Sequence, residues 1–321
     1  MKRIIQFDFI QTACMLYIVG FYHLNNYLHP DLWFSGLTSA SVETMTTAVL
    51  ATFTFISGYM LRRYDFRSLN DVNVFYRKRL IRFYPLFVLS AIGLYIMRYA
   101  YFQQLILGIS GLALFTDTPI KTLWFISMLM LLYAITPMIR YHALIRNRGR
   151  QLLSLCAIII LLIFLYWNGI IEKRLLIYAP LYVIGLGMKD INFSKKTWLV
   201  IAIVSLIAII ATIPLNAVND VVISCLLALF GASLIVSLGF LLPINAFDKL
   251  IYFFAYSSMA AYMFHRHIYG VSLLIFGIRE EEIVYLTWWG ASLVLMVVFV
   301  ASWGIQSIYD KCVAHLLNTS K

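Results

Sequence analysis

The sequence predicts an all-α integral membrane protein with about ten transmembrane helices and cytoplasmic N- and C-termini. Of its 321 residues, 62% are hydrophobic and only 12% are charged, and the mean hydropathy is +0.87. Soluble domains carry about 25% charged residues, so the composition excludes an ordinary soluble protein. Apolar runs of about 20 residues, enough to cross a bilayer, follow one another from residue 9 onward.

The apolar runs are joined by connections too short for a separate soluble domain, so we expect one membrane domain over residues 1–321. The expected spans are 9–28, 42–61, 83–101, 122–140, 151–168, 174–189, 197–214, 221–242, 251–275 and 284–309. The stretch 103–116 is short for a span and is interpreted as interfacial or re-entrant; if it does span, the C-terminus changes sides. The basic start lacks a small-residue cleavage site, so the first span is expected to stay uncleaved.

The distribution of positive charge supports this topology. With the N-terminus inside, 19 of the 25 Lys and Arg residues fall in inside segments and five in outside segments, and Arg266 lies within a span. Lys and Arg are retained in cytoplasmic loops, so the net charge of +11 is explained by topology, and we expect no nucleic-acid partner. The four cysteines lie singly, without metal-binding spacing, so neither a disulfide nor a metal site is expected.

The stretch FISGYMLRRYDFRSLNDVNVFYRKRLIRFYP (55–85) carries the densest basic cluster. Its last part presents four cations at helical spacing: Arg77, Lys78, Arg79 and Arg82. One interpretation is positive-inside topology with attraction to anionic membrane lipids. The other is a site for a polyanion such as the phosphates of a nucleotide-like cofactor, which arginine forks bind well.

Two apolar segments carry buried histidines. In AYSSMAAYMFHRHIYG (255–270), His265 and Arg266 fall near mid-membrane, where an unpaired charge is costly. One face of that helix is polar at i, i+4, i+7 and i+11 spacing: Ser258, Tyr262, His265 and Tyr269. In the first span, His23 lies about 18 Å beyond Gln11 along the helix axis, in the outer half of the membrane. Hydrogen bonding between helices is the alternative explanation for both histidines.

Five stretches together resemble the membrane-bound acyltransferase 3 family. They are FDFIQTACMLYIVGFYH, FTFISGYML, FYRKRLIRFYP, LWFISMLMLLYAITP, which contains Trp124, and YSSMAAYMFH. The family's first helix has an acidic residue, an arginine three positions on and a histidine after ten more residues. Here Gln11 stands at the arginine position and eleven residues separate it from His23, so that Tyr22 occupies the strict position. A helix bulge would absorb that one-residue shift.

The resemblance implies transfer of an acyl group, most often acetyl, from acetyl-CoA to a hydroxyl of a cell-surface or lipid-linked glycan. Neutral imidazole suits the base that takes the hydroxyl proton, and burial keeps a histidine neutral. The residues assigned to catalysis are His23 or else His265 as base, with Tyr22, Tyr262 or Asn25 as oxyanion donors. The residues assigned to the donor are Arg77, Lys78, Arg79, Arg82, Arg266 and Gln11, and those assigned to the acceptor are Asn25, Trp124 and Ser258.

On this interpretation the donor docks at the cytoplasmic basic cluster and its long arm reaches inward to the histidine, and a bacterial plasma membrane is the expected location. The same buried His and Arg residues would also serve an exporter of polysaccharides or small acids. A non-catalytic membrane scaffold is the third possibility, although a scaffold has little use for buried ionisable groups.

Overall fold

The structure, a computed structural model, describes residues 3–28, 39–116, 120, 122–140, 148–188, 191–212, 220–244, 247–280 and 283–319. Helices dominate this part of the chain, and the short antiparallel hairpin of β1 (Ile278–Glu280) and β2 (Ile283–Tyr285) is a small departure from the all-α expectation. The helices fall into two compact units, which are described separately: residues 1–46 with 239–321 (unit 1), and residues 47–238 (unit 2). The expectation of one functional domain stays a prediction.

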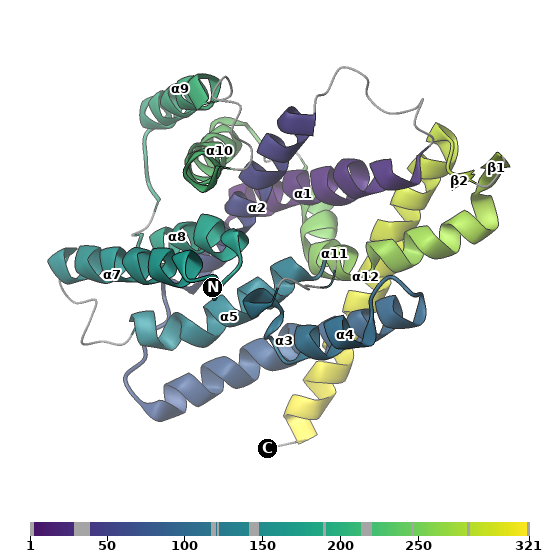
Figure 1. Cartoon of the computed structure of the whole chain (residues 1–321), viewed down its shortest axis with the longest axis horizontal. Coiled ribbons are helices and arrows are strands. Elements are labelled where there is room, and N and C mark those ends of the chain that lie inside the picture. Colours follow the sequence, from purple (N-terminus) through teal and green to yellow (C-terminus); the bar gives the residue numbers. More distant parts are fainter. Residues whose placement is uncertain are drawn as a thin grey trace. The chain divides into compact units, whose positions relative to one another are not determined.

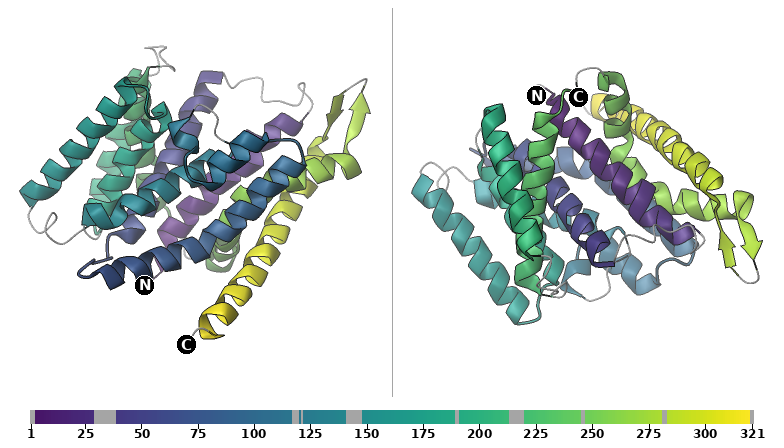
Figure 2. Two further views of the ribbon diagram at one scale, coloured as in Figure 1. Left: turned by 60° about the horizontal axis from the view of Figure 1, so that its bottom comes forward. Right: turned by 90° about the horizontal axis from the view of Figure 1, so that it is seen from above.

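Unit 1 is built on α1 (Ile5–Tyr17), α11 (Asp248–Phe276) and α12 (Trp288–Thr319). Helix α11 packs against both of the others, and Figure 1 shows its ribbon beside α12. The hairpin connects these two helices and projects beyond their ends (Figure 2). The first span does not end as an α-helix: it continues as a π turn, η1 (Ile18–His23), and a 3₁₀ turn, η2 (Leu24–Tyr27).

Unit 2 holds the remaining helices, most of which overlap the expected apolar runs closely, whereas the helix that starts at Leu69 begins well before its expected span. They are α2 (Ser39–Leu61, which starts in unit 1), α3 (Leu69–Ile96), α4 (Phe102–Ile109), η4 (Ala113–Phe115), α5 (Trp124–Arg140), α7 (Arg148–Trp167), α8 (Lys173–Gly187), α9 (Lys195–Thr212) and α10 (Val221–Leu241). Helix α4 has eight residues, about 12 Å of axis, so it is too short to cross a bilayer, as expected for 103–116.

Helix α3 begins 14 residues before the expected span at 83, because its start carries a strong capping signal. The Ser68 hydroxyl accepts from the Asp71 backbone N–H at 3.2 Å, and the Asp71 carboxylate accepts from the Ser68 N–H at 2.9 Å. This reciprocal pair satisfies backbone donors that an uncapped helix leaves free. The basic cluster of residues 77–82 therefore lies on a regular helix.

Helices α2 and α8 of unit 2 approach closely through two glycines. A Cβ atom at Gly58 would overlap the carbonyl of Tyr182, and one at Gly185 would overlap the carbonyl of Phe55. Small residues that let backbones meet are the usual means of packing helices in a membrane, where lipid is as apolar as the side chains.

Six helices of the described chain are long and apolar enough to cross a membrane: Ile5–Tyr27, Ser39–Leu61, Leu69–Ile96, Lys195–Thr212, Val221–Leu241 and Trp288–His315. The other expected spans fall short of this measure for physical reasons. Helices α5 and α8 have 17 and 15 residues, and the apolar part of α7 covers only Cys156–Trp167, against about 20 residues for a perpendicular crossing. Helix α11 is long enough at 29 residues but carries polar side chains throughout.

Candidate functional site

The π turn η1 decides which side chain of the first span faces inward. A π turn inserts one residue into a helix and rotates everything after it by about 100°. His23, the last residue of η1, is 7% exposed, whereas the preceding Tyr22 is 37% exposed. The bulge that the spacing from Gln11 requires is therefore present, and it directs His23 into the protein in place of Tyr22.

His265 lies on α11 and is completely buried. Its Nδ1 atom lies 2.8 Å from the carbonyl oxygen of Tyr262 and 3.1 Å from that of Ala261. A carbonyl oxygen can only accept, so Nδ1 carries the hydrogen and donates to it, and Nε2 holds the lone pair of the neutral ring. That Nε2 atom is buried and has no hydrogen-bond partner among the described residues.

The two histidines lie face to face. Their ring centroids are 4.7 Å apart and their planes differ by 4°. The Nδ1 atom of His23 is also buried and has no hydrogen-bond partner in the described part of the chain. The structure thus brings both sequence-predicted bases together, and each ring keeps one nitrogen unsatisfied. Buried polar atoms normally have partners, so these two nitrogens mark a place where a polar group of a ligand would bind.

Three other predicted residues surround the histidine pair. Tyr262 is buried with its ring 6.1 Å from that of His265, and the ring of Tyr22 lies 5.1 Å from that of His23. Arg266 is close enough to His23 for the two side chains to interact electrostatically, and its Nε atom is buried without a partner among the described residues. A guanidinium whose buried Nε–H donor is unused is suited to an anionic or carbonyl oxygen.

Three further candidates are not engaged with the pair in the described contacts. Ser258 is half-buried, and its hydroxyl donates to the Ala255 carbonyl at 2.7 Å within α11. Asn25 lies half-buried in η2, one turn from His23, and Gln11 lies half-buried on α1. Their roles stay predictions.

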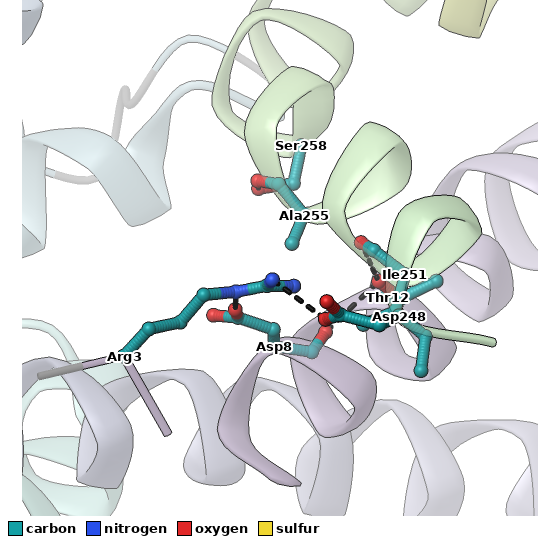
Figure 3. Close-up of polar contacts among 7 residues, drawn as sticks. All are labelled: Arg3, Asp8, Thr12, Asp248, Ile251, Ala255 and Ser258. Carbon is teal, nitrogen blue, oxygen red and sulfur yellow. Dashed lines mark hydrogen bonds and ion pairs between the residues drawn. The ribbon is translucent and has the colours of Figure 1, made fainter. Parts of the chain in front are cut away.

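At the beginning of α1, a charged network joins that helix to α11 (Figure 3). The guanidinium of Arg3 pairs with Asp8 and donates to Asp248 at 2.6 Å. The hydrogen bond from Arg3 to Asp8 raises the pKa of Arg3 above its ordinary value. Deeper along the same pair of helices, Thr12 donates to the backbone carbonyl of Ile251 at 3.4 Å. These contacts hold α1 on α11 and so support the register of the histidine pair further along.

In unit 2, Arg79 of the basic cluster is surrounded by three aromatic rings. Its guanidinium lies 5.6 Å from the ring centroid of Tyr64, 5.8 Å from that of Phe75 and 5.7 Å from that of Tyr133. Its Nε atom is buried without a hydrogen-bond partner in the described residues. Aromatic faces hold the cation without using its N–H donors, which leaves those donors available to a phosphate.

The other unit 2 candidates differ in exposure. Arg77, Lys78 and Arg82 project from α3 as exposed side chains, which fits both lipid attraction and an anionic ligand. Trp124 begins α5, and the guanidinium of Arg174 covers its ring at 4.5 Å. Trp124 is therefore occupied by a cation–π contact within unit 2, and an acceptor-binding role for it stays a prediction.

Sequence reasoning gave no role to Tyr269, although it named the residue on the polar face of α11. Tyr269 is fully buried, its ring lies 5.7 Å from that of His265, and its hydroxyl donates to the backbone carbonyl of Val19 in η1 at 2.6 Å. The aromatic residues around Arg79 were also missed. The signal for Tyr269 was its i+4 spacing from His265, whereas the surroundings of Arg79 depend on three separate segments.

The fold and this site define a multi-pass helical membrane protein with a buried histidine pair. Residues 4–306 match the family model described as an acyltransferase domain, and the chain therefore belongs to the acyltransferase 3 family. No curated protein and no solved structure matches the chain significantly.

Proposed function

We propose that the protein is a membrane O-acyltransferase that moves an acetyl group from acetyl-CoA to a hydroxyl of a cell-surface or lipid-linked glycan. The observation that carries the proposal is the stacked pair of His23 and His265 with a buried, unpartnered Nε2 lone pair. Family membership supports acyl transfer in general. The identities of the acyl group as acetyl, of the donor as CoA and of the acceptor as a glycan are proposed in addition.

In this reaction an imidazole nitrogen accepts the proton of the acceptor hydroxyl as its oxygen bonds to the acyl carbon, and the departing thiolate finally receives a proton. Nε2 of His265 is ready for this role, because the Nδ1 hydrogen is held by backbone carbonyls and fixes the tautomer. His23 lies against it and is the first choice from the family spacing. The two rings form one base site, and the acceptor's pose decides which nitrogen takes the proton.

Charge that develops on the acyl oxygen needs a nearby donor. Tyr262 is a candidate from the buried side of the site, and Tyr22 and Asn25 are candidates from the less buried side. Arg266 offers a charged donor, because its Nε hydrogen has no partner in the described residues. Donors preorganised in a water-poor site contribute more to the rate than they would in water.

The residues of α3 fit the phosphate-rich end of a CoA donor. When bound, such a donor supplies the activated acyl group as a thioester. Arg79 would hold phosphate through N–H donors that its aromatic neighbours leave free, and the exposed cations Arg77, Lys78 and Arg82 would add charge. The three exposed cations are accessible to a polyanion from solution, and this supports assigning the basic cluster to the donor.

The proposal includes ten spans with both termini in the cytoplasm of a bacterial cell, in its plasma membrane. The ratio of 19 inside to five outside cations supports this orientation. Among the counted cations, Lys2, Lys121, Arg146, Lys189 and Lys321 lie outside the described residues. Helices α5, α7, α8 and α11 would complete the ten spans, the short ones where the bilayer or neighbouring helices accommodate them.

Reconstitution into sealed vesicles tests the proposal. Acetyl-CoA labelled in the acetyl group is placed outside, and lipid-linked oligosaccharides and polysaccharides are supplied inside and outside in separate samples. Label should appear as a glycan ester with equal release of free CoA thiol. An exporter is the alternative, because buried, unpartnered Arg and His groups are also typical of transport pathways. Movement of glycan across the vesicle without consumption of acetyl-CoA would establish that alternative.

A further inference from the structure

The π turn η1 needs support from outside its own helix. Its hydrogen bonds run from each carbonyl to the N–H five residues on, which widens the backbone relative to an α-helix, and such turns occur mostly as single inserted turns at functional sites. The sequence Ile18–His23 (IVGFYH) contains no proline that would impose the distortion. The energetic reason for the turn must therefore come from tertiary contacts.

Tyr269 supplies such a contact. Its side chain is fully buried, and its hydroxyl donates to the Val19 carbonyl inside the turn at 2.6 Å. Its ring packs against Tyr27, the last residue of η2, at 4.9 Å between centroids. The same ring lies edge-on to His265, with the planes at 74°. One side chain thus contacts the π turn, the segment that follows the turn, and the histidine on which His23 stacks.

The position of His23 depends on this turn. In an uninterrupted α-helix from Ile5, Tyr22 would take the inward position that His23 occupies, and His23 would point about 100° away. The hydroxyl of Tyr269 bonds to the backbone where the register changes, so it stabilises the conformation in which His23 faces His265.

We propose that Tyr269 is a positioning residue: its hydroxyl, bonded to Val19, holds the π turn and thereby keeps the ring of His23 stacked on His265. The consequence for catalysis rests on the proposed acyltransferase function. The geometric consequence, loss of the stack when the hydroxyl is removed, does not, and the experiment measures the two separately.

The geometric part is tested by NMR of the full-length protein in lipid nanodiscs with ¹⁵N-labelled histidine. Tyr269→Phe removes the hydroxyl and keeps the ring that faces His265. The His265 ring signals, assigned with His265→Gln, should shift because the neighbouring His23 ring has left the stack. Tyr84→Phe is the matched control, since it removes another hydroxyl-to-carbonyl bond, from Tyr84 to Ile109 at 3.0 Å. The control should leave the His265 signals unchanged, and unchanged signals in Tyr269→Phe would overturn the proposal.

A second background covers the case in which Tyr269→Phe fails to fold. Deletion of Tyr22 removes the inserted residue, so an ordinary α-helix then directs His23 toward His265 and no longer needs the hydroxyl. In this background Tyr269→Phe should fold and should leave the His265 signals in place. If Tyr269→Phe misfolds both in the full-length chain and in the chain that lacks Tyr22, Tyr269 serves folding alone and the proposal is wrong. The same conclusion holds if the Tyr22 deletion by itself and Tyr269→Phe by itself both misfold.

The catalytic part is tested with acetyl transfer from labelled acetyl-CoA. Tyr269→Phe should lower kcat at least tenfold with KM for acetyl-CoA within twofold, and His23→Ala added to it should produce little further loss. In Tyr84→Phe, the same His23→Ala change should produce its full loss. A shifted NMR signal without any transfer by the wild-type protein would reject the proposed function and keep the positioning role. Additive losses in the Tyr269→Phe background would reject the positioning role.

Discussion

The imidazole rings of His23 and His265 lie parallel, 4.7 Å apart at their centroids, although 241 residues separate them in the sequence. The contact joins the end of the first span to the middle of α11. Each ring retains a buried nitrogen without a partner among the described residues. Two histidines placed in this way form one chemical unit.

Removing either ring of the pair should abolish most of the activity. We expect His23→Ala to lower acyl transfer by about 10²-fold or more, the loss typical of removing an acid–base catalyst, with a normal protein level in the membrane. His265→Ala should cost a similar factor, and the double variant should be no worse than the more affected single variant, because groups acting as a unit are not additive. Initial rates with labelled acetyl-CoA measure all three.

His315→Ala is the matched control for the histidine pair, since His315 is exposed near the end of α12. It should leave the rate unchanged. Near-wild-type turnover in His23→Ala together with a large loss in His265→Ala would assign the base to His265 alone. Full turnover in both variants would remove the histidine pair from the chemistry.

The cations of α3 should bind the donor. The pair Arg79→Gln with Arg82→Gln should weaken CoA binding at least tenfold, and wild-type affinity should fall as salt is raised, because accessible charge contacts are screened. Isothermal titration calorimetry of the protein in detergent, with CoA and with its dephosphorylated form as ligands, measures the loss of affinity and its salt dependence. The control is Lys195→Gln with Lys196→Gln, two exposed cations at the start of α9. Equal losses from both pairs would instead favour a general role of positive charge in lipid attraction and topology.

Arg266 should matter more for activity than for folding. Its Nε donor is buried and unused within the described residues, so Arg266→Ala should lower transfer strongly while the purified yield is kept. Arg266→Lys should restore it only partly, because a point charge lacks the planar fork. If Arg266→Met is expressed well and is fully active, the guanidinium only snorkels, and the site loses its cation.

The glycine contact between α2 and α8 should be sensitive to a single methyl group. Gly58→Ala should lower the free energy of unfolding by about 1–3 kcal/mol, since overpacking forces the two backbones apart. Unfolding by a denaturing detergent in mixed micelles measures it. Gly187→Ala is the control on the same helix pair, because nothing lies within 4 Å of the added Cβ. A loss in Gly187→Ala as large as that in Gly58→Ala would contradict this explanation.

Much of the helical layout was predictable from the sequence because bilayer-length apolar runs are a one-dimensional signal. The ends of the helices were less predictable where local hydrogen bonding competes with hydropathy. Helix α3 begins at a capping box, 14 residues before the expected span. Strand β2 (Ile283–Tyr285), paired with β1 (Ile278–Glu280), occupies the expected start of the last span at residue 284, so that α12 begins only at Trp288. In both places hydrogen bonding between neighbouring backbone and side-chain groups sets the boundary.

The sequence by itself determined which helices exist, that His23 and His265 are buried in apolar segments, and that the histidine spacing in the first span is one residue too long for the family pattern. Tertiary structure alone decided how that extra residue is accommodated. A π turn is unfavourable in isolation. It forms here where the hydroxyl of Tyr269 bonds to the backbone of Val19, 250 positions earlier in the sequence. The tautomer of His265 and the aromatic surroundings of Arg79 were decided in the same way, because both depend on where folding places carbonyls and rings in three dimensions.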